Sequence, residues 1–108
     1  MNGSEDSNAS EMNEELLGVF ECRVRGIQYY DGKVQNKQMV ELEREPTNPY
    51  DRNAIRVLNV LGEHVGHIER DAAAILADLI DNDVIDVEGF VAYGANNTYS
   101  IPISVAVF

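Results

Sequence analysis

The sequence predicts a mainly β domain with one or two helices, in which six short strands form a small closed or partly open barrel. Two observations lead to this fold class. In most segments between turn residues, apolar and polar residues alternate, which is typical of half-buried strands. One segment, 71–81, has instead the spacing of an amphipathic helix. A chain of 108 residues is long enough for one such domain but not for two.

The first strand is expected to begin at Val19, where the alternation starts, and to run on to Tyr30. In a strand of that length, one of Tyr29 and Tyr30 would face inward. Asp31 and Gly32 then provide a turn.

The remaining strands are each bounded by turn residues or by the helix. They are expected at 38–43, 54–60, 64–68, 84–92 and 99–108. Residues 61–63 are interpreted as one turn, and the pair Asn96–Asn97 as a hairpin turn that needs left-handed backbone conformations.

The helix expected at 71–81 has Asp71 in position to cap it. Its apolar residues form one stripe that would pack on the barrel: Ala72, Ile75, Leu76, Leu79 and Ile80. The acids at and beyond its end are interpreted as a solvated rim: Asp78, Asp81, Asp83, Asp86 and Glu88.

The charges are unevenly distributed. The net charge of −11 argues against binding of long duplexes through phosphates alone. Residues 1–15 carry five acids and no base, 71–108 carry six acids and no base, and 16–70 carry eight of each. The bases could therefore form one basic face on an acidic body. Because residues 1–15 are almost without apolar side chains, we interpret them as a disordered acidic tail and 16–108 as the folded domain.

The loop 45–53 is the most informative stretch, and its two prolines limit its flexibility. Its polar residues have two interpretations. Asn48, Asp51 and Asn53 would close Asx turns onto the backbone of the loop. Alternatively, a rigid loop that displays Asn48, Tyr50 and Asp51 would recognise a small polar group.

A long motif runs through and beyond this loop. It consists of Asn48-Pro-Tyr-Asp-Arg-Asn-Ala-Ile55, then Gly62, then Val65-Gly-His-Ile68, with Tyr29-Tyr30, Met39-Val40 and Gly94-Ala-Asn-Asn97 outside it. Together these residues resemble the HIRAN domain of SWI/SNF-type fork-remodelling translocases, over about residues 17–108.

The resemblance implies an OB-like barrel that binds the 3′ end of single-stranded DNA, with the terminal hydroxyl in a pocket and the last bases stacked on aromatic rings. By motif position, the DNA-binding residues would be Tyr29, Tyr30, Asn48, Tyr50, Asp51, His67 and Tyr99. Two positions depart from the family pattern. Gln28 replaces an arginine, which removes one phosphate contact, and Tyr99 replaces a phenylalanine but keeps the ring face for stacking.

The resemblance further implies a monomeric module in a nuclear parent protein, whose ATPase motor domain it would orient on DNA ends during DNA damage tolerance. The alternative is a protein-interaction module on the same barrel, which the acidic surplus favours.

Signals for catalysis, metals and membranes are absent from the sequence. It contains no P-loop, nucleophile elbow, HExxH or EF-hand motif, so we expect no enzymatic activity. His64 and His67 are three residues apart, which in a regular strand places them on opposite faces and argues against a shared metal ion. We therefore expect no cofactor. No apolar stretch is long enough to cross a membrane.

Overall fold

The computed structural model describes residues 15–93 and 99–108. Within these ranges the chain forms six strands, one α-helix and one 3-10 turn. In chain order they are β2 (Gly18–Arg25), η1 (Ile27–Tyr29), β3 (Gln38–Arg44), β4 (Ile55–Leu58), β5 (His64–Ile68), α2 (Arg70–Asp81), β6 (Val87–Val91) and β7 (Ser100–Val107). The pair Asn96–Asn97, expected as a hairpin turn, lies outside the described residues, as do residues 1–14 of the expected tail.

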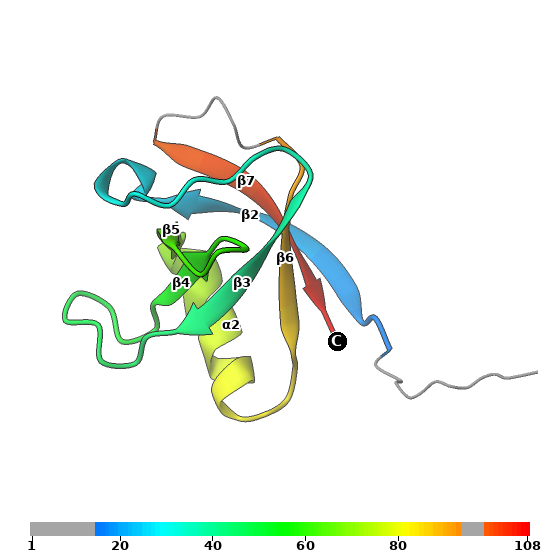
Figure 1. Cartoon of the computed structure of the whole chain (residues 1–108). Coiled ribbons are helices and arrows are strands. Elements are labelled where there is room, and N and C mark those ends of the chain that lie inside the picture. Colours follow the sequence, from blue (N-terminus) through cyan, green and yellow to red (C-terminus); the bar gives the residue numbers. More distant parts are fainter. Residues whose placement is uncertain (1–14, 94–98) are drawn as a thin grey trace, which may run out of the picture.

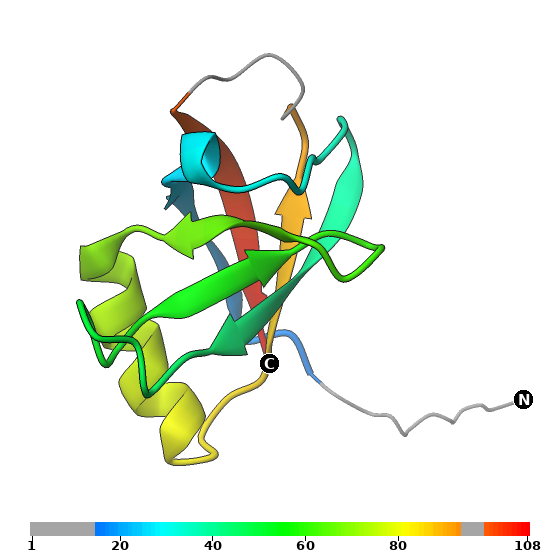
Figure 2. The ribbon, with the colours of Figure 1, turned by 60° about the vertical axis from the view of Figure 1, so that its left-hand side comes forward.

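The strands form a closed antiparallel barrel in the order β2-β5-β4-β3-β6-β7, which confirms the predicted fold class (Figure 1). α2 connects β5 to β6 and packs at one end of the barrel (Figures 1 and 2). The largest fully buried side chains come from the strands and from this helix: Val24, Ile55, Val57, Val65, Leu76, Val91, Ile103 and Val105. Within the described part of the chain, no helix has the length and apolar character needed to cross a membrane.

The first strand ends earlier than expected. Gly26 has a φ of 74°, a left-handed conformation that breaks the extended backbone, and Ile27–Tyr29 then form the short turn η1. Tyr29 is therefore exposed beside a partly buried Tyr30, and the two do not alternate across a sheet.

Gly32 does not form a turn, contrary to expectation; the turn lies at residues 36–37. The amide of Gly32 donates to the carbonyl of His64 at 3.0 Å, and a Cβ at this position would collide with the same carbonyl. The segment after η1 can therefore lie directly against β5 because residue 32 has no side chain.

The helix differs from the prediction at its start and in its buried face. Its N-cap residue is Glu69, and Asp71 lies in the first turn. The Glu69 carboxylate accepts a hydrogen bond from the amide of Arg23, so it ties α2 to β2 instead of capping the helix. The fully buried helix residues are Ala73, Leu76 and Ala77, whereas Ile75 is 64% exposed.

β4 and β6 are shorter than expected. Buried Asn59 ends β4, because its amide donates to the carbonyl of Lys33 and to Glu63 while its oxygen accepts from the amides of Leu61 and Glu63. The five acids around the end of α2 are all exposed, as predicted.

Candidate functional site

The loop 45–53 is folded by its own side chains. Asn48 Oδ1 accepts hydrogen bonds from the amides of Tyr50 and Asp51, at 2.8 and 3.1 Å. Asp51 Oδ1 accepts one from the amide of Asn53 at 2.9 Å. The Asx-turn interpretation is therefore correct for Asn48 and Asp51, whereas Asn53 contributes its backbone. These turns fix the direction in which Tyr50 projects, and its side chain is 86% exposed.

A β-bulge in β5 brings two histidines together. Along β5, His67 pairs with Arg56 of β4, and Gly66 pairs with Val57. The next residue of β4, Leu58, pairs with His64. Val65 is therefore an extra residue without a partner on β4. The extra residue reverses the alternation, and the two imidazole rings lie 4.9 Å apart. The prediction that His64 and His67 lie on opposite faces is therefore wrong. No group of three or more potential metal ligands occurs within the described ranges.

Tyr30 completes this aromatic cluster. Its ring stacks on His64 at a centroid distance of 3.9 Å and meets the edge of His67 at 5.7 Å. Burial, and after it the neighbouring imidazole of His67, lower the pKa of His64, so its ring is neutral at physiological pH. Burial and the Glu45 carboxylate raise the pKa of Tyr30, so its hydroxyl stays protonated.

A cavity of about 420 Å³ lies between the loop, β5 and the start of α2. Its lining residues are Arg25, Tyr30, Asn48, Tyr50, Asp51, Ala54, His67, Ile68, Glu69 and Arg70. Five of the seven predicted site residues are in this set, drawn from three segments that are far apart in the sequence.

The other two predicted residues lie outside the lining of the cavity but at the same end of the barrel. Tyr29 is on η1 and is 79% exposed, and Tyr99 immediately precedes β7 and is 67% exposed. The first residue of β7, Ser100, pairs with Arg25, which does line the cavity. Figures 1 and 2 both place η1 beside the start of β7.

Two arginines of the site were not predicted. Arg70 donates to the carbonyl of Tyr50 at 2.6 Å and to Asp51 Oδ2 at 3.4 Å, so it spans the mouth of the cavity. Arg25 pairs with His67 across β2 and β5. The confinement of all bases to residues 16–70 was a signal for a basic face, but only the strand register places Arg25 next to His67.

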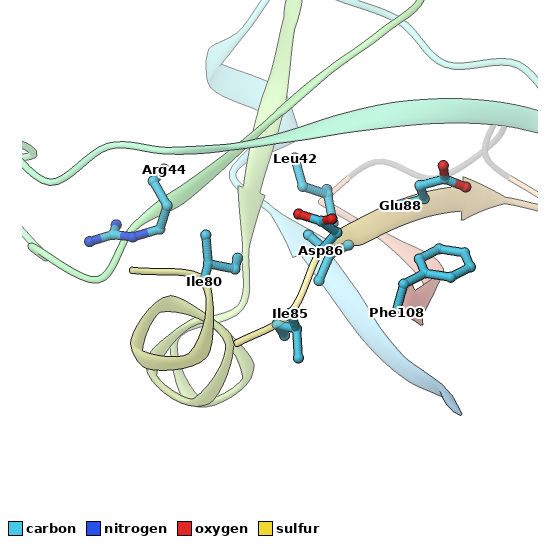
Figure 3. Close-up of a pocket in the computed structure, with 8 residues that line it drawn as sticks. Leu42, Arg44, Ile80, Ile85, Asp86, Glu88 and Phe108 are labelled. Carbon is cyan, nitrogen blue, oxygen red and sulfur yellow. The ribbon is translucent and has the colours of Figure 1, made fainter. Parts of the chain in front are cut away.

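A second cavity, of about 370 Å³, lies between the end of α2, β3 and the start of β6 (Figure 3). Figure 3 shows the carboxylates of Asp86 and Glu88 beside it, opposite Arg44. Because Arg44 is already paired with Asp81, this cavity presents excess negative charge. It is therefore less suited to an anionic ligand than the cavity at the loop, where two arginines balance Asp51 and Glu69.

Comparison with known proteins decides the family. Residues 17–108, which include all six strands and the helix, match the model of the HIRAN domain family. The chain belongs to the HIRAN domain family. The family resemblance expected from the motif at residues 48–68 is thereby confirmed.

This HIRAN domain is similar to segments of much longer proteins. It is 51% identical over 88 residues to the helicase-like transcription factor of Mus musculus, covering 82% of this chain and 9% of that protein. It is 48% identical over 95 residues to the putative SWI/SNF-related matrix-associated actin-dependent regulator of chromatin subfamily A member 3-like 1 of Arabidopsis thaliana. That match covers 86% of this chain and 11% of the relative. The chain thus spans about a tenth of the length of these relatives.

Solved structures of a HIRAN domain from human helicase-like transcription factor (HLTF) share the fold. The crystal structure superposes with a TM-score of 0.82 at 44% identity, covering 85% of this chain and 76% of that one. An NMR structure of the HLTF HIRAN domain in its DNA-bound conformation superposes with a TM-score of 0.77 at 43% identity. The superposition covers 91% of this chain and 80% of that one.

Proposed function

We propose that this HIRAN domain binds the 3′-hydroxyl end of single-stranded DNA and has no catalytic role of its own. The observation that carries this proposal is the composition of the cavity at the loop. Two arginines, Arg25 and Arg70, line it together with the exposed Tyr50. Of its two carboxylates, Glu69 already accepts from the amide of Arg23, whereas one oxygen of Asp51 faces Arg70 at 3.4 Å. A terminal nucleotide offers the matching groups: a hydroxyl that donates, a base that stacks and a phosphate that accepts.

Each part of the nucleotide has a candidate partner. The hydroxyl would donate to Asp51, because a carboxylate is a strong acceptor. The exposed rings of Tyr29, Tyr50 and Tyr99 would stack on the last bases, at about 1–3 kcal/mol per base.

Arg25 and Arg70 would face the phosphates. An arginine at position 28 would be expected to bind a phosphate, but this chain has Gln28 there, exposed on η1. The guanidinium groups of Arg25 and Arg70 would supply the positive charge that Gln28 does not provide.

Tyr30, His67 and Asn48 line the same cavity, but their polar groups are partly engaged within the protein. Tyr30 and His67 approach each other at 3.4 Å, and the Asn48 amide is bonded to the loop and to Glu45. We infer that these three residues shape the pocket and contribute secondary contacts to the terminal phosphate.

The relatives extend the proposal beyond the domain. Because they are named as helicase-like or SWI/SNF-related proteins, we infer that residues 16–108 act as a monomeric module of a nuclear protein with an ATPase motor. In such a protein, the module would place the motor on a DNA end, as fork remodelling in DNA damage tolerance requires.

The direct test is competition in fluorescence anisotropy. A short single strand labelled at its 5′ end would be bound and then displaced by an unlabelled linear strand, by a strand with a blocked 3′ end, or by a circular single strand of equal length. We expect the linear strand with a free 3′ end to compete and the circle to fail, because the circle has no terminal hydroxyl. Equal competition by the circle overturns end recognition.

The acidic surplus supports one other function, a protein-interaction module. Failure of the domain to bind any single strand at low salt would favour that alternative.

A further inference from the structure

We propose that Glu45 is the positioning residue of the pocket: it orders His67 and Asn48 for the DNA end without contacting the DNA itself. This inference rests on the proposed function. Glu45 does not line the cavity, but His67 and Asn48 do. Glu45 can therefore order the pocket only through these two residues.

One oxygen of Glu45 joins the loop to β5. Oε1 accepts a hydrogen bond from His67 Nε2 at 2.5 Å and another from Asn48 Nδ2 at 3.2 Å. The two side chains of the His67–Glu45 pair are 22% and 26% exposed, so water screens this pair only in part. Burial opposes the ionisation of Glu45, but the hydrogen bonds from His67 and Asn48 hold its pKa below the usual value, and it is a carboxylate at neutral pH.

The carboxylate determines which ring nitrogen of His67 acts as the donor towards it. Because an ionised carboxylate can only accept, the proton of the imidazole must be on Nε2. Nδ1 is then directed at the hydroxyl of Tyr30, 3.4 Å away. Without Glu45, either ring nitrogen could carry the proton and the ring could rotate. The orientation of two groups in the cavity wall, His67 and Tyr30, thus depends on a residue outside it.

The same oxygen fixes the amide of Asn48. Because Nδ2 donates to Glu45, Oδ1 is turned towards the amides of Tyr50 and Asp51. A flipped amide would place its NH2 group against these two donors. The hydrogen bond to Glu45 therefore reinforces the orientation in which Asn48 holds the backbone of Tyr50 and Asp51.

The first experiment examines the free protein and needs no DNA. Long-range proton–nitrogen NMR spectra of the imidazoles would be compared for the wild type, Glu45→Ala and the matched control Glu43→Gln. Glu43 is an acid on β3 that pairs with Arg56. We expect the His67 proton on Nε2 in the wild type and the control, and a mixture of both tautomers in Glu45→Ala. An unchanged His67 tautomer in Glu45→Ala overturns the positioning role.

The second experiment measures affinity for a short 5′-labelled single strand. We expect Glu45→Ala to weaken binding about tenfold, because two hydrogen bonds that order the pocket are lost. Glu45→Gln keeps an acceptor oxygen at the same place and should bind within about threefold of the wild type. Glu45→Asp keeps the charge but withdraws it by one methylene, so it should also weaken binding, and it remains informative if the alanine variant does not fold.

The outcomes separate this inference from the proposed function. Tighter binding by Glu45→Ala would mean that the carboxylate is merely a like charge near DNA, which overturns the positioning role. Wild-type affinity in both Glu45→Ala and Glu45→Asp overturns it as well. A wild-type domain that binds no single strand overturns the proposed function, and the NMR comparison then still decides whether Glu45 orders the pocket.

Discussion

Arg44, the last residue of β3, forms a bidentate ion pair with Asp81, the last residue of α2, with Nε–Oδ1 and Nη2–Oδ2 distances of 2.9 Å. The same guanidinium donates to the carbonyls of Ala54 at 2.7 Å and Arg52 at 2.9 Å. The hydrogen bond to Asp81 raises the pKa of Arg44, and the guanidinium lowers the pKa of Asp81. Arg44 thus ties the loop that displays Asp51 both to the barrel and to the helix.

The contribution of Arg44 can be measured by urea denaturation. We expect Arg44→Gln to lower the free energy of unfolding by about 2 kcal/mol, because two carbonyl acceptors and the ion pair lose their donor. Asp81 is exposed and its loss leaves the carbonyl bonds intact, so Asp81→Asn should have a clearly smaller effect. Equal losses in the two variants would mean that the ion pair, rather than the carbonyl bonds, holds the loop.

Asp51 is predicted to distinguish a 3′-hydroxyl from a 3′-phosphate. A phosphate would bring negative charge against the Asp51 carboxylate, whereas a hydroxyl donates to it. We expect the wild type to reject 3′-phosphate strands. Asp51→Asn should weaken binding of 3′-hydroxyl strands about tenfold. The difference in affinity between 3′-hydroxyl and 3′-phosphate strands should become smaller.

Asp51 also accepts a hydrogen bond from the amide of Asn53, so the substitution could unsettle the loop. The thermal stability of the Asp51→Asn variant must therefore be measured in parallel. A variant that loses thermal stability but keeps its discrimination would assign Asp51 to the turn alone. If the wild type binds 3′-hydroxyl and 3′-phosphate strands equally, Asp51 does not accept a hydrogen bond from the terminal hydroxyl.

The exposed tyrosines are predicted to act in binding and not in folding. Tyr50→Ala and Tyr29→Ala should each weaken single-strand binding by about 1–3 kcal/mol, the range for one stacked base. Their melting temperatures should stay close to that of the wild type, because both rings are largely exposed. Leu61→Ala is the matched control, since Leu61 is an equally exposed residue in the turn between β4 and β5. An equal loss of affinity in this control would argue against stacking.

Binding is predicted to depend weakly on salt. Arg25 and Arg70 line the cavity, although Arg70 is also paired with Asp51 at 3.4 Å. Arg44 and Arg56 are paired with carboxylates outside that lining. About two to four neutralised phosphates would give a slope of about −1.4 to −2.8 in a plot of log affinity against log salt, at about −0.7 per phosphate. Titrations between low and physiological salt would measure this slope. A slope near about −7, as about ten phosphates would give, would contradict the proposed site.

Acidification is predicted to destabilise the domain in two steps. The pKa of His64 is lowered by folding from its usual 6.5, so the unfolded chain binds this proton more readily and stability falls as the pH drops below 6.5. The pKa of Glu45 is also lowered, from 4.5, so a second loss follows below that pH. Melting temperatures across this range should show both steps. His64→Gln should reduce the first step and leave the second, and an undiminished first step in that variant would assign it to another group.

Much of the candidate site could be predicted because its residues are contiguous in sequence. Asn48, Tyr50 and Asp51 lie in one short loop, and their turns form between near neighbours, so local chemistry was sufficient to single them out. Arg25 and Arg70 could not be found in this way. Their place depends on the pairing of β2 with β5 and on the angle at which α2 leaves β5, and neither is encoded in a local pattern.

The sequence by itself determined that this chain is a small six-stranded barrel with one helix, and it singled out the loop that carries most of the proposed recognition residues. These conclusions follow from alternation, helix spacing and a contiguous motif, which are properties of neighbouring residues. Tertiary structure alone decided the end of the first strand at Gly26, the bulge that brings His64 to His67, and the contact between Glu45 and His67. The physical reason is that strand register and close backbone packing are set by distant partners, and one extra residue in a ladder reverses the side to which every following side chain points.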